Sequence, residues 1–325
     1  MKNLLLVLVL VFLAAASAAA ADANPRQMLA DGQANEALAA LKAKTQASPK
    51  DAEAFHQLAH AYYVMELWDD AITAEQQAVT LAPNNSEYHL ILGCAYGNKA
   101  ETISKFAFFT AVKLAHVTRA EFEKSVELDG NNVEARRDLA EYYAEAPGFF
   151  GLGGSKEKAR AQAEKVKDID AAASHWIKAR AAEEDKKNDV AEAEYRAALV
   201  ASSNPAKDWL EFASYYRHKK RYPEMEEAIN KAVSLDDKKP SIVLFDAASQ
   251  LLRAGRNFPL AVTLARKYIS EEKHADEAPL FQAHFLLGQI LEKQNDKKGA
   301  ADEYKAALAL ASDYKRAQDA LKKLQ

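Results

Sequence analysis

Large, apolar and small residues recur along the chain in a register that is typical of α-helices. A large residue is followed by an apolar residue at the third position, a small residue at the fourth and a bulky residue at the seventh. Because an α-helix has 3.6 residues per turn, these offsets place four side chains on one stripe. The register occurs at Phe55, Leu58, Ala59 and Tyr62, at His89, Leu92, Gly93 and Tyr96, at Arg136, Leu139, Ala140 and Tyr143, at Trp209, Phe212, Ala213 and Tyr216, at Leu244, Ala247, Ala248 and Leu251, and at His284, Leu287, Gly288 and Leu291.

Each of these stripes is followed by a second, shorter stripe of helical spacing, for example Ala71, Glu75 and Ala78. The pair of stripes recurs at about 34 residues, which indicates a chain built from repeated helical hairpins. A single hairpin cannot cover its own apolar face, so neighbouring hairpins are expected to stack around one continuous core. Breaking sequences such as Ala82-Pro83-Asn84-Asn85 and Asp129-Gly130-Asn131-Asn132 stand where a hairpin should end.

The chain resembles the tetratricopeptide repeat family, whose pattern is W-x2-L-G-x2-Y followed by A-x3-F and P. The pattern is matched by Trp209, Phe212, Ala213 and Tyr216, and then by Met225 and Ile229. The resemblance covers nearly all of the chain after residue 21 and implies an all-α fold, a solenoid of antiparallel helical hairpins coiled as a right-handed superhelix. A protein of this kind is expected to act as a non-catalytic scaffold for protein–protein interactions.

We expect residues 22–325 to form a single domain of about 7–8 repeats. The predicted units are a half repeat at 24–51, then repeats at 52–85, 86–132, 133–171, 172–205, 206–240, 241–280 and 281–313, and a capping helix at 314–325. Two repeats are longer than the period and carry insertions near 97–117 and 147–155.

Residues 1–21 have the pattern of a signal peptide. Lys2 precedes an apolar run from Leu4 to Ala16, and Ala18-Ala19-Ala20 and Ala19-Ala20-Ala21 offer small-x-small cleavage sites. The run is shorter than the roughly 20 residues that a membrane-spanning helix needs. The pattern predicts a Sec-type bacterial signal and a periplasmic or secreted protein without a membrane span.

Composition agrees with a helical protein that does not bind nucleic acid. The chain is 49% hydrophobic and 28% charged, and its 43 Lys and Arg against 47 Asp and Glu leave a net charge of −4. Only 11 Gly and 9 Pro are present, which is few for an all-β protein of this size. The single cysteine, Cys94, cannot form an intrachain disulfide.

Signals for catalysis are weak, and we expect neither enzymatic activity nor a cofactor. No H-E-x-x-H, C-x-x-C, G-x-S-x-G or Walker A sequence occurs. His56 and His60 have metal-ligand spacing on one helix face, but Glu53 and Tyr63 are poor third ligands. A solvent-facing pair without metal is the favoured interpretation, with peptide contact and a metal site as alternatives. The glycine-rich stretch before Ser155 predicts a long hairpin turn, with a partner-binding loop or an anion site as alternatives.

In the tetratricopeptide repeat family, side chains of the first helix of each repeat line a concave groove. The resemblance places the partner-binding groove at His56, His60, Tyr63, Arg137, Glu141, Trp176, Arg180 and Arg217, and at the register-equivalent positions Leu90, Cys94, Leu210, Ser214, Phe245, Ser249, Arg253, Phe285 and Gln289. Aromatic and arginine side chains in such a groove suit a peptide segment or protein partner. The Lys and Asn clamp that some members use for a carboxyl terminus is absent. The weak register around Trp176 leaves open a place for it in the core.

The two insertions are the second candidate contact surface, through Phe106, Phe109, Phe149 and Phe150. Because Lys99 to Val117 contains no Gly or Pro, the first insertion is predicted to be a projecting helical extension. Its apolar residues need a cover, for which we favour the glycine-rich loop of the next repeat over a partner chain. Ala95 to Glu101 together with Ala146-Pro147-Gly148 and Gly153-Gly154-Ser155 resembles a group of secreted bacterial tetratricopeptide repeat proteins without an assigned function.

The sequence therefore predicts an exported protein that binds a peptide segment or protein partner of unidentified nature in a concave groove. Two alternatives remain open at this point. One is a self-associating structural subunit, a homo-oligomer. The other is a periplasmic protein that binds a small ligand or metal, or that acts as an enzyme.

Overall fold

The computed structural model describes residues 24–324, so the predicted signal peptide at 1–21 lies outside the described residues. Residues 24–324 form 17 α-helices, one short 3-10 helix and no strand. The predicted all-α fold of stacked helical hairpins is confirmed.

The helices follow one another as pairs. Their bounds are α2 (Pro25–Ala30) with α3 (Ala34–Ala47), α4 (Ala52–Val64) with α5 (Trp68–Leu81), α6 (Ser86–Thr102) with α7 (Phe108–Leu128), α8 (Val133–Glu145) with α9 (Lys156–Val166), α10 (Ala171–Glu184) with α11 (Asn188–Ala201), α12 (Pro205–His218) with α13 (Tyr222–Leu235), α14 (Ile242–Ala254) with α15 (Phe258–Ile269), and α16 (Leu280–Lys293) with α17 (Lys297–Leu310). A last helix, α18 (Lys315–Leu324), follows the eighth pair, and the 3-10 helix η1 (Lys105–Ala107) joins α6 to α7.

Several hairpins begin with the same local device, an Asp or Asn whose side chain caps the first helix. Asp51, Asn132 and Asp170 each accept a hydrogen bond from the backbone N–H three residues later, at 2.8–3.0 Å. Asn85 caps α6 in the same way. Such a cap satisfies an N–H group that has no partner inside the helix and contributes about 1 kcal/mol. The capping residues therefore fix where each hairpin starts.

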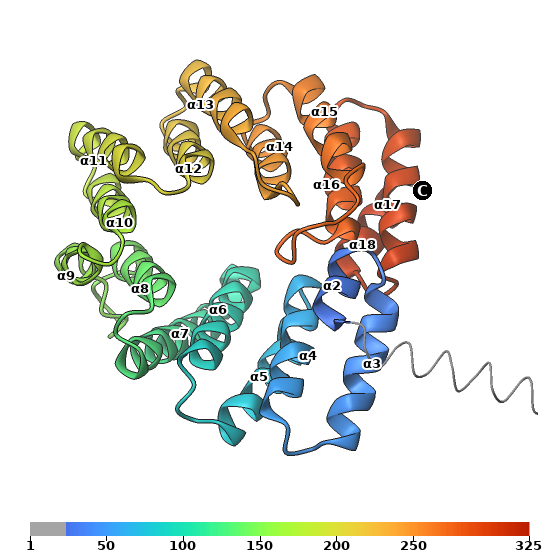
Figure 1. Ribbon diagram of the computed structural model, residues 1–325, viewed down its shortest axis with the longest axis horizontal. Helices are drawn as coiled ribbons and strands as arrows, with labels where there is room; N and C mark the ends of the chain where they lie inside the picture. The colour runs from blue at the N-terminus through green and yellow to red at the C-terminus, as the bar shows by residue number, and fades with distance from the viewer. Residues whose placement is uncertain (1–23, 325) are drawn as a thin grey trace, which may run out of the picture.

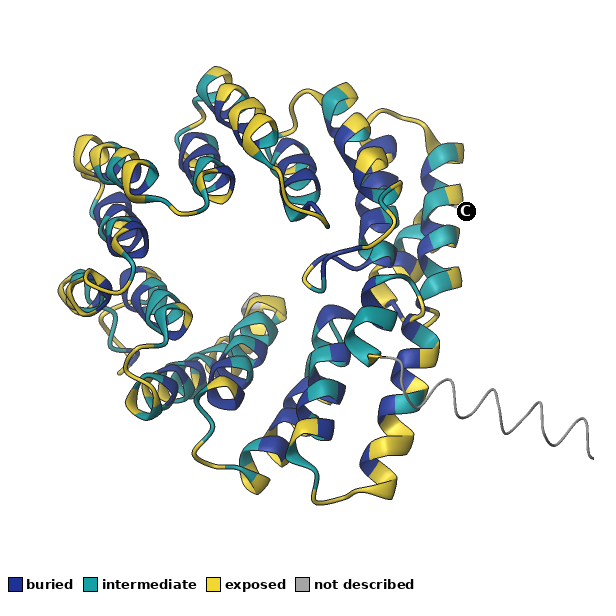
Figure 2. Ribbon diagram, viewed as in Figure 1, coloured by how far each residue is buried: buried dark blue, intermediate teal, exposed yellow. Residues whose placement is uncertain are grey.

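The hairpins are arranged as a ring. Figure 1 shows the first helix of most pairs on the inside, among them α4, α8, α10, α12 and α14, and the second helix on the outside. Exposed residues are concentrated on the outer helices, whereas the inner helices are largely buried (Figure 2). One hydrophobic core of buried residues runs from Leu29 in α2 to Ala317 in α18.

The small residue at the fourth position of the stripe permits close contact between the two helices of a hairpin. A Cβ atom added to Gly93 in α6 would lie 2.6 Å from the ring of Phe122 in α7. A Cβ atom added to Gly288 in α16 would lie 2.5 Å from the ring of Tyr304 in α17. Carbon atoms do not pack at such distances, so these glycines set the spacing of their hairpins.

The ends of the chain of hairpins meet, which the sequence pattern does not predict. The Glu66 carboxylate, in the turn after α4, accepts hydrogen bonds from Tyr314 Oη at 3.3 Å and Arg316 Nη1 at 2.6 Å. Asn35 Oδ1 in α3 accepts from Ser312 N and Ser312 Oγ, both at 2.9 Å. These contacts join the N-terminal hairpins to α17 and α18 and close the ring, as Figure 1 shows.

The first insertion is mostly helical but is broken once. The hairpin has long arms, α6 with 17 residues and α7 with 21. Ser104 Oγ accepts a hydrogen bond from Phe106 N and starts the 3-10 turn η1 between the two helices. The extension is therefore a projecting helical hairpin with a tight tip.

The glycine-rich loop at 147–155 lies against α7, although its cover of the insertion is partial. His116 Nε2 lies 3.0 Å from the Phe150 carbonyl oxygen, and Arg119 Nη1 donates to the Gly151 carbonyl at 2.8 Å. Phe150 contacts Phe108 edge to face, with ring centroids 5.4 Å apart. The expectation that the loop covers Phe106 and Phe109 is wrong, because both remain largely exposed. The loop packs along α7 at Phe108, His116 and Arg119, whereas Phe106 and Phe109 point away from it into solvent.

We predict that Gly93→Ala destabilises the protein by about 1–3 kcal/mol, because the new methyl group collides with the buried Phe122 ring. Gly97→Ala, one turn later in α6, is the matched control. Its Cβ would meet nothing closer than Thr118 Cγ2 at 3.5 Å. Alanine favours the helix by up to about 1 kcal/mol at such a site. Urea unfolding of both variants measures the difference, and equal stabilities would contradict the packing account.

We predict that Asn35→Ala combined with Arg316→Ala opens the ring, because each lost hydrogen-bonding group at the junction costs about 1 kcal/mol. Small-angle X-ray scattering should show a larger radius of gyration at unchanged helix content. Glu292→Ala removes the acceptor of Tyr304 Oη, a 2.8 Å contact inside one hairpin. That control should lower stability without expanding the molecule.

Candidate functional site

The predicted histidine pair lies at the closure of the ring and is not solvent-facing. His56 is 2% exposed; its Nδ1 lies 3.0 Å from Glu75 Oε1 and its Nε2 lies 2.8 Å from Arg26 Nη2. Burial works to lower the pKa of His56, but the hydrogen bond and charge of Glu75 outweigh it and raise the pKa. The expected solvent-facing pair is wrong, because the N-terminal hairpin covers this part of α4.

His60 contributes to the same closure through the loop at 270–279 between α15 and α16. His60 Nε2 lies 3.3 Å from Asp276 Oδ2, and Arg26 lies 3.7 Å from the same oxygen. Burial, followed by the charges of Arg26 and His56, lowers the pKa of His60 to about 3. Burial raises the pKa of Asp276 to about 6. This part of the predicted groove is therefore occupied by the chain itself.

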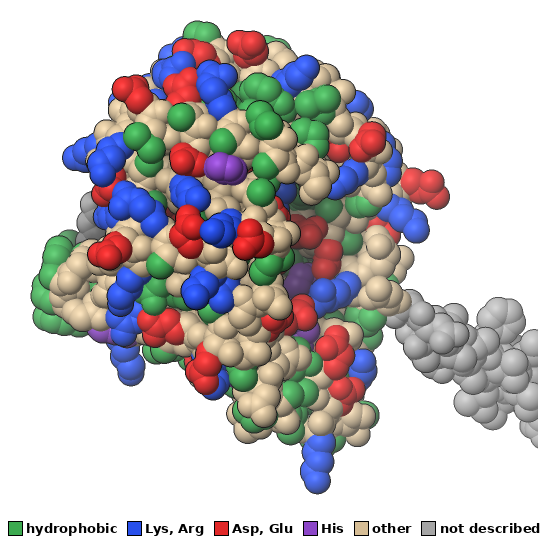
Figure 3. Space-filling view, turned by 60° about the vertical axis from the view of Figure 1, so that its left-hand side comes forward, with side chains coloured by type: hydrophobic (Ala, Val, Ile, Leu, Met, Phe, Trp, Pro, Cys, Tyr) green, Lys and Arg blue, Asp and Glu red, His purple; other side chains and the backbone are tan. Residues whose placement is uncertain are grey.

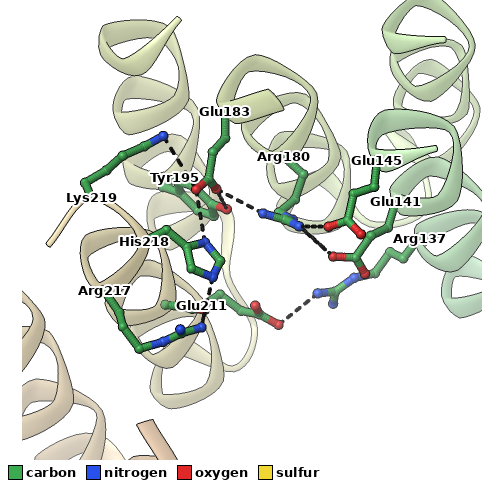
Figure 4. A network of polar contacts seen from close by, with 11 residues as sticks. Arg137, Glu141, Glu145, Arg180, Glu183, Tyr195, Glu211, Arg217, His218 and Lys219 are labelled. Atoms are coloured by element: carbon green, nitrogen blue, oxygen red, sulfur yellow. Dashed lines mark hydrogen bonds and ion pairs between the residues drawn. The ribbon is translucent and has the colours of Figure 1, made fainter. Parts of the chain in front are cut away.

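Arg180 in α10 is the centre of a network of charges on the inner face of the ring (Figure 4). Its Nη2 donates to Glu141 Oε1 at 2.9 Å and to Glu145, both in α8, and its Nη1 donates to Glu183 Oε2 at 3.0 Å. With 9% of its surface exposed, the guanidinium is largely desolvated. Burial opposes its charge, but Glu141, Tyr195 and Glu183 outweigh burial and raise its pKa above the ordinary value.

Glu183 extends the network from α10 to the end of α12. Its Oε1 lies 3.0 Å from His218 Nδ1 and 3.7 Å from Lys219 Nζ. Burial works to raise the pKa of Glu183, but the hydrogen bond to His218 and the charge of Arg180 are stronger and lower the pKa. The network therefore links consecutive repeats, because its partners come from α8, α10 and the end of α12.

Arg137 and Trp176 form a second bridge between repeats. The Arg137 guanidinium lies 4.0 Å from the ring centroid of Trp176 in α10, and its Nη2 donates to Glu211 in α12 at 3.1 Å. Trp176 is buried, which is the alternative that the sequence analysis allowed because the register of its repeat is weak. A cation stacked on an indole and paired with a carboxylate has its main interactions satisfied inside the chain.

Three further predicted groove positions are occupied in similar ways. Tyr63 Oη accepts from Asn98 Nδ2 at 2.9 Å, and Arg217 Nε donates to Gln250 Oε1 at 2.9 Å. The Cys94 thiol donates to Asp138 at 3.3 Å, and burial raises its pKa. A protonated thiol is a poor nucleophile.

An open pocket of about 160 Å³ lies on the inner face between α12 and α14. Ser214, Ser249 and Arg253 are predicted groove residues, and Leu210 supplies an apolar base. The full lining is Lys207, Leu210, Glu211, Ser214, Asp246, Ser249, Gln250 and Arg253. Two successive repeats therefore line one pocket.

The charges of this pocket differ from those of the Arg180 network. No ion pair within 24–324 involves Lys207, Arg253 or Asp246. Burial, and then the charge of Glu211, raises the pKa of Asp246 to about 6, although Arg253 and Lys207 act in the opposite direction. Both cations are thus available to a ligand.

A second helical pattern in the sequence marks these pocket residues, but it lies beside the apolar register that defines the repeats and is less conspicuous. Lys207, Leu210, Glu211 and Ser214 have the offsets 0, 3, 4 and 7, and so do Asp246, Ser249, Gln250 and Arg253. Apart from Leu210, both sets are polar, and each forms a stripe beside the core stripe of its helix. Phe285 and Gln289, also predicted for the groove, lie instead in a pocket that Arg316 and Lys323 of α18 help to line.

The predicted contact residues of the insertions lie apart from this pocket. Phe106 and Phe109 are at the tip of the α6–α7 hairpin and Phe149 and Phe150 are in the α8–α9 loop, all exposed. Figure 3 shows that elsewhere on this side of the molecule positive and negative side chains are interspersed. Across residues 24–324 no group of three or more His, Cys, Asp or Glu side chains is placed to hold a metal ion.

Comparisons with known proteins agree with this architecture. The tetratricopeptide repeat family model matches residues 28–93. Yeast Tom70 superposes with a TM-score of 0.53 at 16% identity, over 90% of this chain and 58% of that chain. A tetratricopeptide repeat protein from Parabacteroides merdae superposes with a TM-score of 0.42 at 16% identity, over 84% of this chain and 98% of that one. A thermophilic protein of the same kind from Thermus thermophilus superposes with a TM-score of 0.44 at 17% identity, over 56% of this chain and 90% of that one.

Residues 28–93 match the tetratricopeptide repeat family, and the described chain as a whole has the helical-repeat fold of such proteins. It spans 58% of the length of the Tom70 structure. No curated protein sequence matches it. Tetratricopeptide repeat proteins are in general non-catalytic scaffolds for protein partners. Among residues 24–324, no helix is both long and apolar enough to cross a membrane.

We predict that Asp246→Asn stabilises the protein near pH 7.5 by about 1–3 kcal/mol and has little effect near pH 4. The folded protein binds the Asp246 proton more tightly than the unfolded chain does, because the pKa is about 6 in the pocket against an ordinary 3.8. The stabilising contribution of this group is therefore complete below pH 4 and is lost as the pH rises through 6. Chemical unfolding at both pH values measures it, with exposed Asp237→Asn as control.

Proposed function

We propose that the protein is a non-catalytic scaffold that binds a segment of a protein partner on the inner face of α12 and α14. The pocket between these helices supports this proposal, because it joins side chains of two repeats and keeps the charges of Lys207 and Arg253 unpaired. Such a surface can recognise a partner only if it has hydrogen-bond donors and acceptors that are not already paired within the chain.

The chemistry of the pocket favours a polar, extended segment. Ser214, Ser249 and Gln250 supply hydroxyl and amide groups, and Leu210 supplies a small apolar base. Lys207 and Arg253 suit an acidic side chain of the partner, since both are cations without an ion pair among residues 24–324. The Arg180 network is a less suitable site, because its carboxylates and guanidinium already satisfy one another.

The proposal includes export to the periplasm or beyond, which rests on the signal-peptide pattern of residues 1–21. Cleavage near Ala20 to Ala23 is expected. N-terminal sequencing of the native protein tests it, and an intact Met1 would refute the export without affecting the binding site.

The binding proposal is tested by site-specific cross-linking. A photoreactive amino acid in place of Ser249, on the inner face, should capture a discrete partner from the envelope fraction. The same group in place of exposed Ser234, on the outer helix α13, should not. Mass spectrometry identifies the captured protein, and equal capture at both positions would mean non-specific adhesion and contradict the proposal.

With that partner in hand, we predict that Arg253→Ala weakens binding by about 1–3 kcal/mol, because a charge-assisted contact in the pocket is lost. Arg266→Ala, in the outer helix α15, is the control, since Arg266 is also exposed and has no ion pair among residues 24–324. Isothermal titration calorimetry measures both affinities. Equal affinity of the two variants would exclude this pocket as the binding site.

A further inference from the structure

The tips of two neighbouring hairpins carry a cluster of exposed phenylalanine side chains. Phe106 is 103% exposed and Phe109 is 82% exposed, and Phe108, Phe149 and Phe150 are 46–63% exposed. The rings touch in sequence, Phe109 with Phe108, Phe108 with Phe150, and Phe150 with Phe149, at centroid distances of 5.0–5.8 Å. We call these five residues the aromatic tip.

The aromatic tip is held in place and is not a loose loop. His116 and Arg119 of α7 bind the carbonyl oxygens of Phe150 and Gly151, and Leu152 beside them is buried. Phe150 has a φ of 55°, a left-handed conformation that is rare for a bulky residue. The fold thus presents apolar rings to the outside although its own core does not need them there.

The two segments that carry the aromatic tip contain basic but no acidic residues. Residues 102–120, between Glu101 and Glu121, and residues 146–156, between Glu145 and Glu157, contain Lys105, Lys113, His116, Arg119 and Lys156 but no Asp or Glu. Of these, Arg119 is paired with Glu123 at 3.6 Å. Lys113 is exposed and Lys156 partly exposed, and neither has an ion pair among the described residues. We call Lys113 and Lys156, which lie in the two segments that carry the rings, the basic collar.

We propose that the aromatic tip docks the protein on an anionic lipid surface, with the phenylalanine rings inserted among the acyl chains and the basic collar against the headgroups. Phenylalanine has no polar group that must remain hydrated, so its ring can be buried fully in an apolar phase. Each Lys or Arg near an anionic membrane surface adds to the attraction. Figure 3 shows that the protrusion at the left edge of the view is covered with hydrophobic side chains, as such a wedge requires.

A second copy of the chain is a poorer occupant. Two aromatic tips meeting face to face would bring together their Lys113 and Lys156 side chains, neither of which has an ion pair among residues 24–324. The tip is also narrow, since it consists of one 3-10 turn, the first turn of α7 and one loop, whereas a stable interface needs about 800 Å² from each partner.

Vesicle sedimentation tests the proposal. The protein is expressed in a bacterial host and used in the form that the host produces. Wild-type protein should sediment with phosphatidylcholine vesicles that contain about 30% phosphatidylglycerol, and far less with phosphatidylcholine alone. About 0.5 M salt should weaken the binding by screening the basic collar. All variants carry the same N-terminus, so any contribution of residues 1–21 is common to them.

Phe106→Ser combined with Phe109→Ser should reduce the partition coefficient at least about tenfold, because two side chains lose their place in the apolar phase. Because both side chains are exposed, the double substitution should leave the melting temperature unchanged. Val190→Ser with Val200→Ser, which removes two exposed apolar side chains of α11, should bind like wild type. Lys113→Glu should weaken binding to the anionic vesicles.

Three outcomes would overturn the proposal. The wild-type protein could fail to bind anionic vesicles, or the valine variant could lose binding as much as the phenylalanine variant. Alternatively, light scattering could show a dimer that only the phenylalanine variant abolishes, without vesicle binding, which would assign the aromatic tip to a second copy. Cross-linking at Ser249 is independent of all three, so this proposal and the partner-binding proposal can fail separately.

Discussion

The structure depends on one packing constraint: a helical hairpin has an apolar face that only another hairpin can cover. Each pair covers its predecessor, and the close approach that Gly93 and Gly288 permit keeps the two helices of their hairpins in contact with the shared core. In an open solenoid the first and last faces would still need caps. Here the ends meet, with Glu66 and Asn35 receiving hydrogen bonds from the C-terminal segment, so the ring reduces the surface that a cap must cover.

Closure changes what the inner face can do. First helices that would line an open groove are brought near one another, and their charges are partly desolvated. A desolvated charge must find a partner, and Arg180 does so with Glu141, Glu145 and Glu183. The charges left for a ligand lie between α12 and α14, where Lys207 and Arg253 have no ion pair among residues 24–324.

The two insertions break the period without breaking the stack. Each lengthens one hairpin at its tip, away from the faces that pack against neighbouring repeats, so the core is unaffected. Their apolar rings touch one another across two repeats, as Phe108 and Phe150 do, yet remain exposed. The inner pocket and the aromatic tip thus differ in chemistry: the first offers charged and hydroxyl groups in a hollow, and the second offers apolar rings on a projection.

The sequence by itself determined the helical hairpins, since helical spacing, capping residues such as Asp51 and Asn132, and small residues at the close contacts are all local. It also marked the two insertions and several residues of the α12–α14 pocket. Only the tertiary structure decided that the ends of the chain meet, that His56 is buried against Arg26 and Glu75, and that Arg180 is consumed by its own neighbours. The reason is that ring closure results from the small rotations between successive repeats, added over the whole chain. It brings together residues more than 200 positions apart, such as Glu66 and Arg316, and no local sequence pattern predicts such contacts.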